Sequence, residues 1–141
     1  MPYRQPTVGK VRVWDLVSGK TIWPEIRDDV FRKFLQCLKV VRVCLVKNLK
    51  DPRDKRGEPI GGLGLRGWPI CINATLHKKW YLRILIHELA HFVFPDAKEE
   101  DILEVERVLL RKFTKKQKVV LGAYIPKRFL KKIPARTTWH R

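Results

Sequence analysis

The spacing of the apolar residues changes within the first third of the chain. Between residues 7 and 17 apolar residues alternate with polar ones, which predicts a strand, and Ser18-Gly19-Lys20 predicts a turn after it. Over residues 24–39 the apolar residues recur every four positions, which predicts a helix. Residues 40–46 are nearly all apolar and rich in valine, as expected of a strand that is buried on both faces.

Glycines and prolines mark the middle of the chain. The polar, charged residues 47–59 include two prolines and predict a loop, whereas residues 60–75 contain four glycines followed by an apolar run and predict one or two strands. Pro69 cannot donate a hydrogen bond to a neighbouring strand, so it favours an edge position. Residues 62–67 match the pattern GxGxxG, but a strand-like run follows where a dinucleotide site needs a helix, so a hairpin or edge strand is the favoured interpretation.

The clearest helical pattern lies at residues 76–94, where the apolar residues share one face and Pro95 ends the helix. A second helix is predicted over about residues 97–113, with Asp96 and Glu99 at the spacing of a capping box. Beyond residue 114 the pattern predicts a short strand at residues 119–124 and a short helix at residues 127–133.

These elements predict an α+β fold with a three- to four-stranded mixed sheet. A chain of 141 residues is long enough for one hydrophobic core, so we expect residues 1–141 to form a single domain, with residues 114–141 as a basic C-terminal extension. Neither a signal peptide nor an apolar run of the ~20 residues that span a membrane is recognised, so we expect a cytoplasmic protein with no membrane span. Three cysteines without a CxxC pair agree with a reducing compartment.

The net charge predicts polyanionic partners. The chain has 31 Lys and Arg residues against 14 Asp and Glu residues, a formal net charge of +17. Residues 107–141 hold twelve of these cations, no acidic residue and four aromatic residues. Nucleic acid is therefore a candidate partner of this segment, through phosphate contacts and base stacking. The alternative is a solvated basic surface whose aromatic residues pack in the core.

The candidate chemistry lies in His87-Glu88-Leu89-Ala90-His91, on the strongest predicted helix. Two histidines four residues apart project from one face of a helix and can bind one zinc ion together. Zinc lowers the pKa of a bound water to about 7, and Glu88 is placed to take the proton of that water and pass it to a leaving amine. The alternative is that His87 and His91 are ordinary surface or core histidines.

Two histidines and a water leave one zinc position to fill. No third histidine follows at the spacing HExxHxxGxxH, because the glycine position is Phe94 and the last ligand position is Ala97. No cysteine lies downstream of Cys71, so a carboxylate of the next helix is the candidate.

Glu99 is our first choice for the third ligand. Taking ~100° per residue, Glu99 and Glu106 lie on the apolar stripe of the second helix, and Glu100 and Glu104 lie on the other side. A tight turn at residue 95 would place Glu99 opposite the two histidines, with Glu106 farther along, suited to orient a ligand histidine. The alternative role of Glu99 is helix capping.

The HELAH segment followed by a glutamate-bearing helix resembles the gluzincin group of zinc metallopeptidases, in particular the single-domain minigluzincins. The resemblance implies a zincin-like fold in which a strand–helix–strand–strand order precedes the active-site helix and a "glutamate helix" follows it. It also implies His87 and His91 as zinc ligands, Glu88 as general base and a glutamate of the second helix as third ligand. The Glu-x-x-x-Asp pair common in the family is absent here. Glu100 and Glu104 are its nearest equivalent.

The expected function is that of a zinc-dependent metallopeptidase, a hydrolase that cleaves a peptide or protein substrate with zinc-activated water, acting near nucleic acid. Tyr81 and Tyr124 are the candidates for stabilising the oxyanion of this reaction. The alternative function is that of a catalytically inactive zincin-fold protein that binds nucleic acid and keeps zinc for stability.

Overall fold

The computed structural model describes residues 7–8, 11–17, 24–64 and 69–134, and among them four short strands form a mixed sheet. The strands are β3 (Val43–Val46), β4 (Gly62–Gly64), β5 (Ile70–Asn73) and β6 (Phe129–Leu130), in the order β4-β5-β3-β6. Strand β3 is parallel to both β5 and β6, whereas β4 is antiparallel to β5. The two edges of the sheet are therefore β4 and β6.

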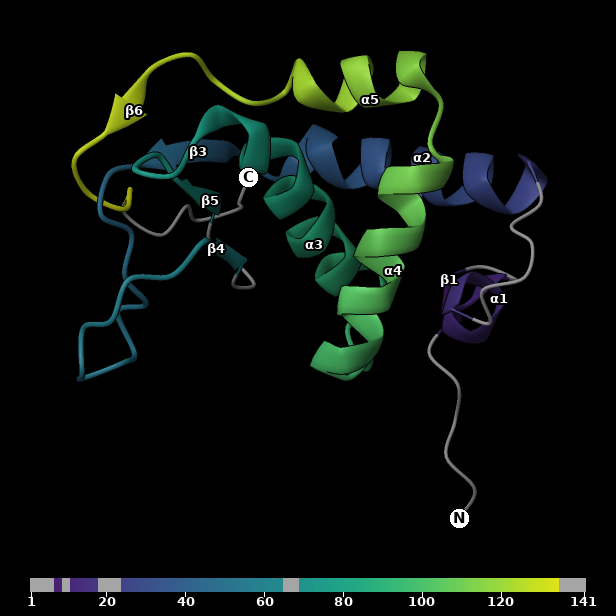
Figure 1. Cartoon of the computed structure of the whole chain (residues 1–141), viewed down its shortest axis with the longest axis horizontal. Coiled ribbons are helices and arrows are strands. Elements are labelled where there is room, and N and C mark those ends of the chain that lie inside the picture. The colour runs from purple at the N-terminus through teal and green to yellow at the C-terminus, as the bar shows by residue number, and fades with distance from the viewer. Residues whose placement is uncertain (1–6, 9–10, 18–23, 65–68, 135–141) are drawn as a thin grey trace.

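Helices cover one face of this sheet (Figure 1). They are α2 (Pro24–Val40), α3 (Tyr81–Val93), α4 (Glu99–Lys112) and α5 (Lys115–Gly122), and a 3-10 turn, η1 (Lys78–Trp80), precedes α3. The N-terminal part adds an antiparallel pair of strands, β1 (Thr7–Val8) and β2 (Val11–Arg12), and the short helix α1 (Val13–Val17), which packs against α4. The structure thus confirms a small α+β domain with a mixed sheet.

Apolar side chains form two cores, one on each face of the sheet. The larger core lies between the sheet and the helices and includes Phe34 of α2, Leu89 of α3 and Leu109 of α4, each fully buried. The smaller core lies on the other face, around Cys44 and Cys71, which are partners in the β3–β5 register. Because α3 buries one face against the larger core, the opposite face of this helix is fixed in direction, and the candidate residues lie there.

Several local predictions were wrong. Residues 7–17 are not one strand, because a helix begins at Val13, and residues 119–124 lie mostly in α5. A capping box starts α5: the Thr114 hydroxyl accepts from the Gln117 backbone, and the Gln117 side chain accepts from the Thr114 backbone. The predicted helix at residues 127–133 instead contains β6, which pairs with β3.

The predicted positions of two single residues were also wrong. Pro69 directly precedes β5, which is an interior strand, and the edge strand next to it is β4. Asp96 does not cap α4, because the N-cap residue is Lys98, whose side chain makes no capping hydrogen bond. No helix in the described ranges has the length and apolar character needed to cross a membrane.

Candidate metal centre

Helices α3 and α4 lie side by side and run in opposite directions (Figure 1). Glu99, at the start of α4, contacts His91 near the end of α3, while Glu106, farther along α4, contacts Arg83 near the start of α3. The short turn after Phe94 therefore returns the chain along α3, as the sequence predicts. This pairing brings carboxylates of one helix to the histidines of the other.

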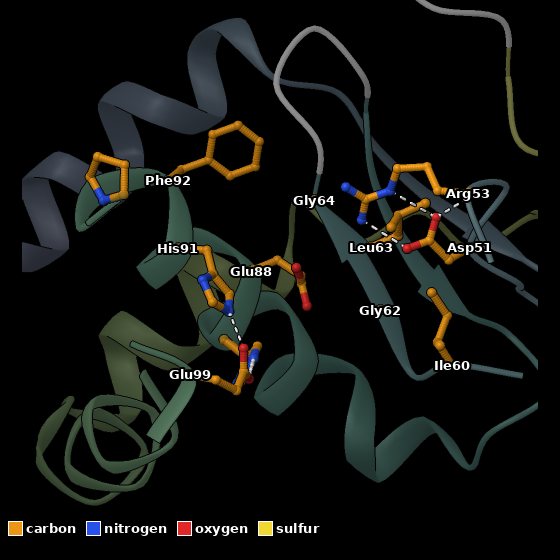
Figure 2. Close-up of a pocket in the computed structure, with 12 residues that line it drawn as sticks. Asp51, Arg53, Ile60, Gly62, Leu63, Gly64, Glu88, His91, Phe92 and Glu99 are labelled. Atoms are coloured by element: carbon orange, nitrogen blue, oxygen red, sulfur yellow. Dashed lines mark hydrogen bonds and ion pairs between the residues drawn. The ribbon is translucent and has the colours of Figure 1, made fainter. Parts of the chain in front are cut away.

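One carboxylate joins the two histidines. Oε1 of Glu99 lies 2.7 Å from Nε2 of His87, and Oε2 lies 2.9 Å from Nε2 of His91. The two imidazole rings are 4.9 Å apart between centroids, and Figure 2 shows Glu99 facing His91. One donor atom from each of the three residues lies within 4.8 Å of the other two. The predicted set of His87, His91 and Glu99 is thus brought together.

Glu106 holds the other ring nitrogen of His87. Nδ1 of His87 donates to Oε1 of Glu106 at 2.9 Å, and Nε of Arg83 donates to Oε2 of the same carboxylate. Glu106 is 4% exposed, and although burial raises its pKa, the hydrogen bonds from His87 and Arg83 bring the pKa below its usual value. With Nδ1 held by Glu106, the other ring nitrogen, Nε2, faces Glu99 and is the atom of His87 on which a metal could replace a proton.

Glu88 points from α3 towards the glycines of β4 (Figure 2). A Cβ placed on Gly62 would lie 3.0 Å from Oε2 of Glu88, and one placed on Gly64 would lie 3.0 Å from Oε1. Burial raises the pKa of Glu88 to about 7, with His87 opposing and the charges of Glu99 and Glu106 adding to the rise. The carboxyl group is therefore enclosed between helix and strand, and glycine is required there because a larger residue would displace it.

The pKa values of the two histidines are shifted in opposite directions. For His87, burial lowers the pKa, but the hydrogen bond to Glu106 and the nearby carboxylates outweigh burial and raise it. For His91, burial dominates and lowers the pKa. The difference follows from Glu106, which forms a hydrogen bond with His87 and none with His91.

A cleft of about 850 Å³ opens over these residues. His87, Glu88, His91 and Glu99 line one wall, and the strand β4 lines the other. Asp51 and Arg53 lie beyond β4, across the cleft from His91 (Figure 2). Two hydrogen bonds from the Arg53 side chain to the Asp51 carboxylate, at 3.0 Å and 2.8 Å, join these two residues of the loop.

Comparison of the chain with protein-family models, curated proteins and solved structures finds no match. The chemistry of the site is therefore inferred from its own residues.

The donor set fits zinc. Two imidazoles and one carboxylate form a ligand set used by catalytic zinc sites. Ligands of a tetrahedral zinc lie about 3.4 Å apart, given bonds of about 2.1 Å. The separations of 2.7 Å and 2.9 Å between Glu99 and the histidines need only a small opening to reach that value. The Glu106 contact to Nδ1 also matches the support that ligand histidines usually have.

The other candidates lie elsewhere. The ligand atoms of Glu100 and Glu104 are not part of the cluster, and Glu104 instead accepts a hydrogen bond from Arg107 at 2.9 Å. The Tyr81 hydroxyl donates to the backbone carbonyl of Ala74 at 3.0 Å, outside the cleft lining, and Tyr124 is an exposed residue after α5.

Sequence reasoning missed three features of the site. Arg83 lies four residues before His87 on α3, so the helical period could have placed it beside Glu106. The packing of Gly62 and Gly64 against Glu88 could be suspected from the sequence only through the glycine-rich pattern of the strand. Nothing in the sequence indicates that Asp51 lines the cleft, because its position depends on how its loop folds back.

Proposed function

We propose that the protein is a zinc-dependent metallopeptidase of the gluzincin type. The observation that carries the proposal is the convergence of His87, His91 and the Glu99 carboxylate at the wall of a cleft, with Glu88 beside them. When bound by this set, zinc would polarise a substrate carbonyl and lower the pKa of a water molecule.

Glu88 is the residue proposed to move the proton. Its carboxylate would accept a proton from the attacking water at Oε1 or Oε2 and deliver it to the leaving nitrogen of the peptide bond. The cleft that Glu88 lines is large enough for a peptide segment, and the β4 backbone beside it faces the same space. His87 is oriented for its role by Glu106, which in turn is held by Arg83.

The edge strand β4 supports a peptide as the substrate. It pairs with β5 on one side only, so the backbone N–H and C=O groups of its other side are available among the described elements. An extended peptide can add to such an edge through main-chain hydrogen bonds. That mode would place a backbone carbonyl of the substrate in the cleft beside Glu88.

The number of donors favours an enzyme over a protein that keeps zinc only for stability. Zinc in a structural site is normally held by four protein ligands. Within the described ranges the cluster contains three side chains that could hold a metal ion, and it lines an open cleft. Three ligands leave a position for water or substrate, which is the arrangement that hydrolysis needs.

The test combines metal content with cleavage. We expect about one zinc per chain in the wild type by elemental analysis and none in a His87→Ala/His91→Ala double variant. Glu88→Gln should keep the zinc and lose cleavage of a proteome-derived peptide mixture, followed by mass spectrometry of new termini. A wild-type protein that binds no zinc after reconstitution refutes the proposal. Equal cleavage by the wild type and Glu88→Gln refutes the role of Glu88.

A further inference from the structure

Five cations lie near an exposed aromatic residue, Phe129, at the edge of the sheet opposite to β4: four flank it in the sequence, and Lys47 contacts its ring from the end of the neighbouring strand. We name this group the β6 surface, and its members are Lys47, Lys127, Arg128, Phe129, Lys131 and Lys132. All five cations are exposed, and Phe129 is 49% exposed. No acidic residue occurs in the sequence from residue 107 onwards.

The sheet register brings the cluster together. Phe129 is the partner of Leu45 and Leu130 is the partner of Val46, and the backbone N–H of Lys47 donates to the carbonyl of Leu130 at 3.0 Å. Lys47 therefore lies next to the end of β6, where Lys131 and Lys132 follow. Its ammonium nitrogen lies 4.5 Å from the centre of the Phe129 ring.

The two residues of β6 have opposite environments. Leu130 packs against the smaller core, whereas Phe129 is directed away from that core and stays half exposed, since neighbouring strand residues alternate between faces. Lysines alone would be explained by the need to protect an edge strand from pairing with other chains. A large exposed aromatic residue among them works against that protection and points to a ligand.

The positive charges of the surface are not neutralised by the acidic residues that the structure describes. Within that part of the chain, none of the five cations forms an ion pair, while Asp51 and Asp54 of the nearby loop are paired with Arg53 and Arg56. A ligand of this surface should therefore supply several negative charges and a flat ring for Phe129. Single-stranded nucleic acid supplies both, through its phosphates and its unpaired bases.

We propose that the β6 surface binds single-stranded nucleic acid. Lysine and arginine side chains contact phosphates, and one base stacks on Phe129. An anionic membrane fits less well, because binding to a bilayer surface relies on a broad apolar face and Phe129 is the one exposed apolar residue of the surface. The surface lies at the opposite edge of the sheet from β4, the strand beside the metal centre, and these two edge strands are about 14 Å apart at ~4.8 Å per strand, so both sites can be occupied together.

The experiment measures binding of the full chain to a fluorescent oligo(dT) of about 12 nucleotides by anisotropy at several salt concentrations. Phe129→Leu, which keeps an apolar side chain but removes the ring, should weaken binding about tenfold at unchanged salt slope. Phe129→Tyr keeps the ring and should bind like the wild type. Lys131→Ala/Lys132→Ala should reduce the magnitude of the salt slope by about 1.4, that is, about 0.7 for each phosphate that the variant no longer neutralises.

The matched control is Lys115→Ala/Lys116→Ala, which removes the same charge from exposed positions of α5. Its salt slope should equal that of the wild type. Equal slope changes in the two double variants, or equal affinity of Phe129→Leu and the wild type, would show diffuse attraction of a polyanion and overturn the proposal. So would binding to anionic vesicles without binding to oligo(dT). Because His87→Ala/His91→Ala leaves the β6 surface intact, its oligo(dT) affinity should be unchanged, which separates this proposal from the metallopeptidase.

Discussion

The contact between β4 and α3 predicts that Gly62→Ala destabilises the protein. A Cβ at this position would lie under 3.0 Å from Cγ2 of Ile84 and 3.0 Å from Oε2 of Glu88. Ile84 is branched and packs against the larger core, so it cannot move aside without moving α3 or the strand. Such overpacking costs about 1–3 kcal/mol of the free energy of unfolding. With a urea dependence of about 1.5 kcal/mol per molar, a loss of about 2 kcal/mol lowers the denaturation midpoint by about 1.3 M.

The assay is urea denaturation of the full chain followed by far-ultraviolet circular dichroism. Gly64→Ala should have a smaller effect, because the added Cβ meets Glu88 and Phe92 at 3.0 Å and 3.1 Å, at the ends of their side chains. Gly122→Ala is the matched control: nothing lies within 4 Å of its Cβ, and alanine in a helix gains about 0.5–1 kcal/mol over glycine. A Gly62→Ala protein as stable as the wild type would refute the close packing of strand on helix.

Three further predictions concern other parts of the molecule. At the proposed zinc site, Glu106→Gln should weaken zinc binding about 10- to 100-fold in a competition titration with a chromophoric chelator, because His87, a proposed ligand, loses its charged partner; Glu104→Gln on the same helix should have no effect. Burial raises the pKa of Cys71 to about 12 and that of Cys37 to about 11, so both thiols stay protonated at pH 8, and native protein should resist iodoacetamide while urea-unfolded protein reacts fully. Thr114→Ala should cost about 1 kcal/mol of the free energy of unfolding, since it removes the cap of α5, and a urea midpoint equal to that of the wild type would contradict this.

The sequence predicted the grouping of the candidate ligands well because this grouping depends on helical geometry. The spacing of His87 and His91 places both rings on one face whenever the segment is helical. The same periodicity identified Glu99 and Glu106 as the carboxylates that face α3, and the structure places both in contact with His87. Both predictions follow from helical geometry alone and do not depend on how the strands pair.

Elements that depend on distant partners were predicted poorly. Strand β6 has two residues, and only its pairing with β3, more than eighty positions earlier in the chain, makes it a strand. Local periodicity cannot detect such a pairing, and it also misread the apolar run around Val119 as a strand. The Thr114–Gln117 capping box was the local signal that could have corrected this second error.

The separation of the candidate metal ligands along the chain has a consequence for folding. All three lie between residues 87 and 99, on two consecutive helices joined by a short turn. Closing so short a segment costs little chain entropy, whereas the far wall of the cleft comes from β4 and the loop around Asp51, which lie well upstream. The helical pair can therefore assemble early, through contacts of low sequence separation, before the sheet is complete. A metal captured at that stage would guide the remaining chain into place, so ion binding and substrate binding would be acquired at different steps of folding.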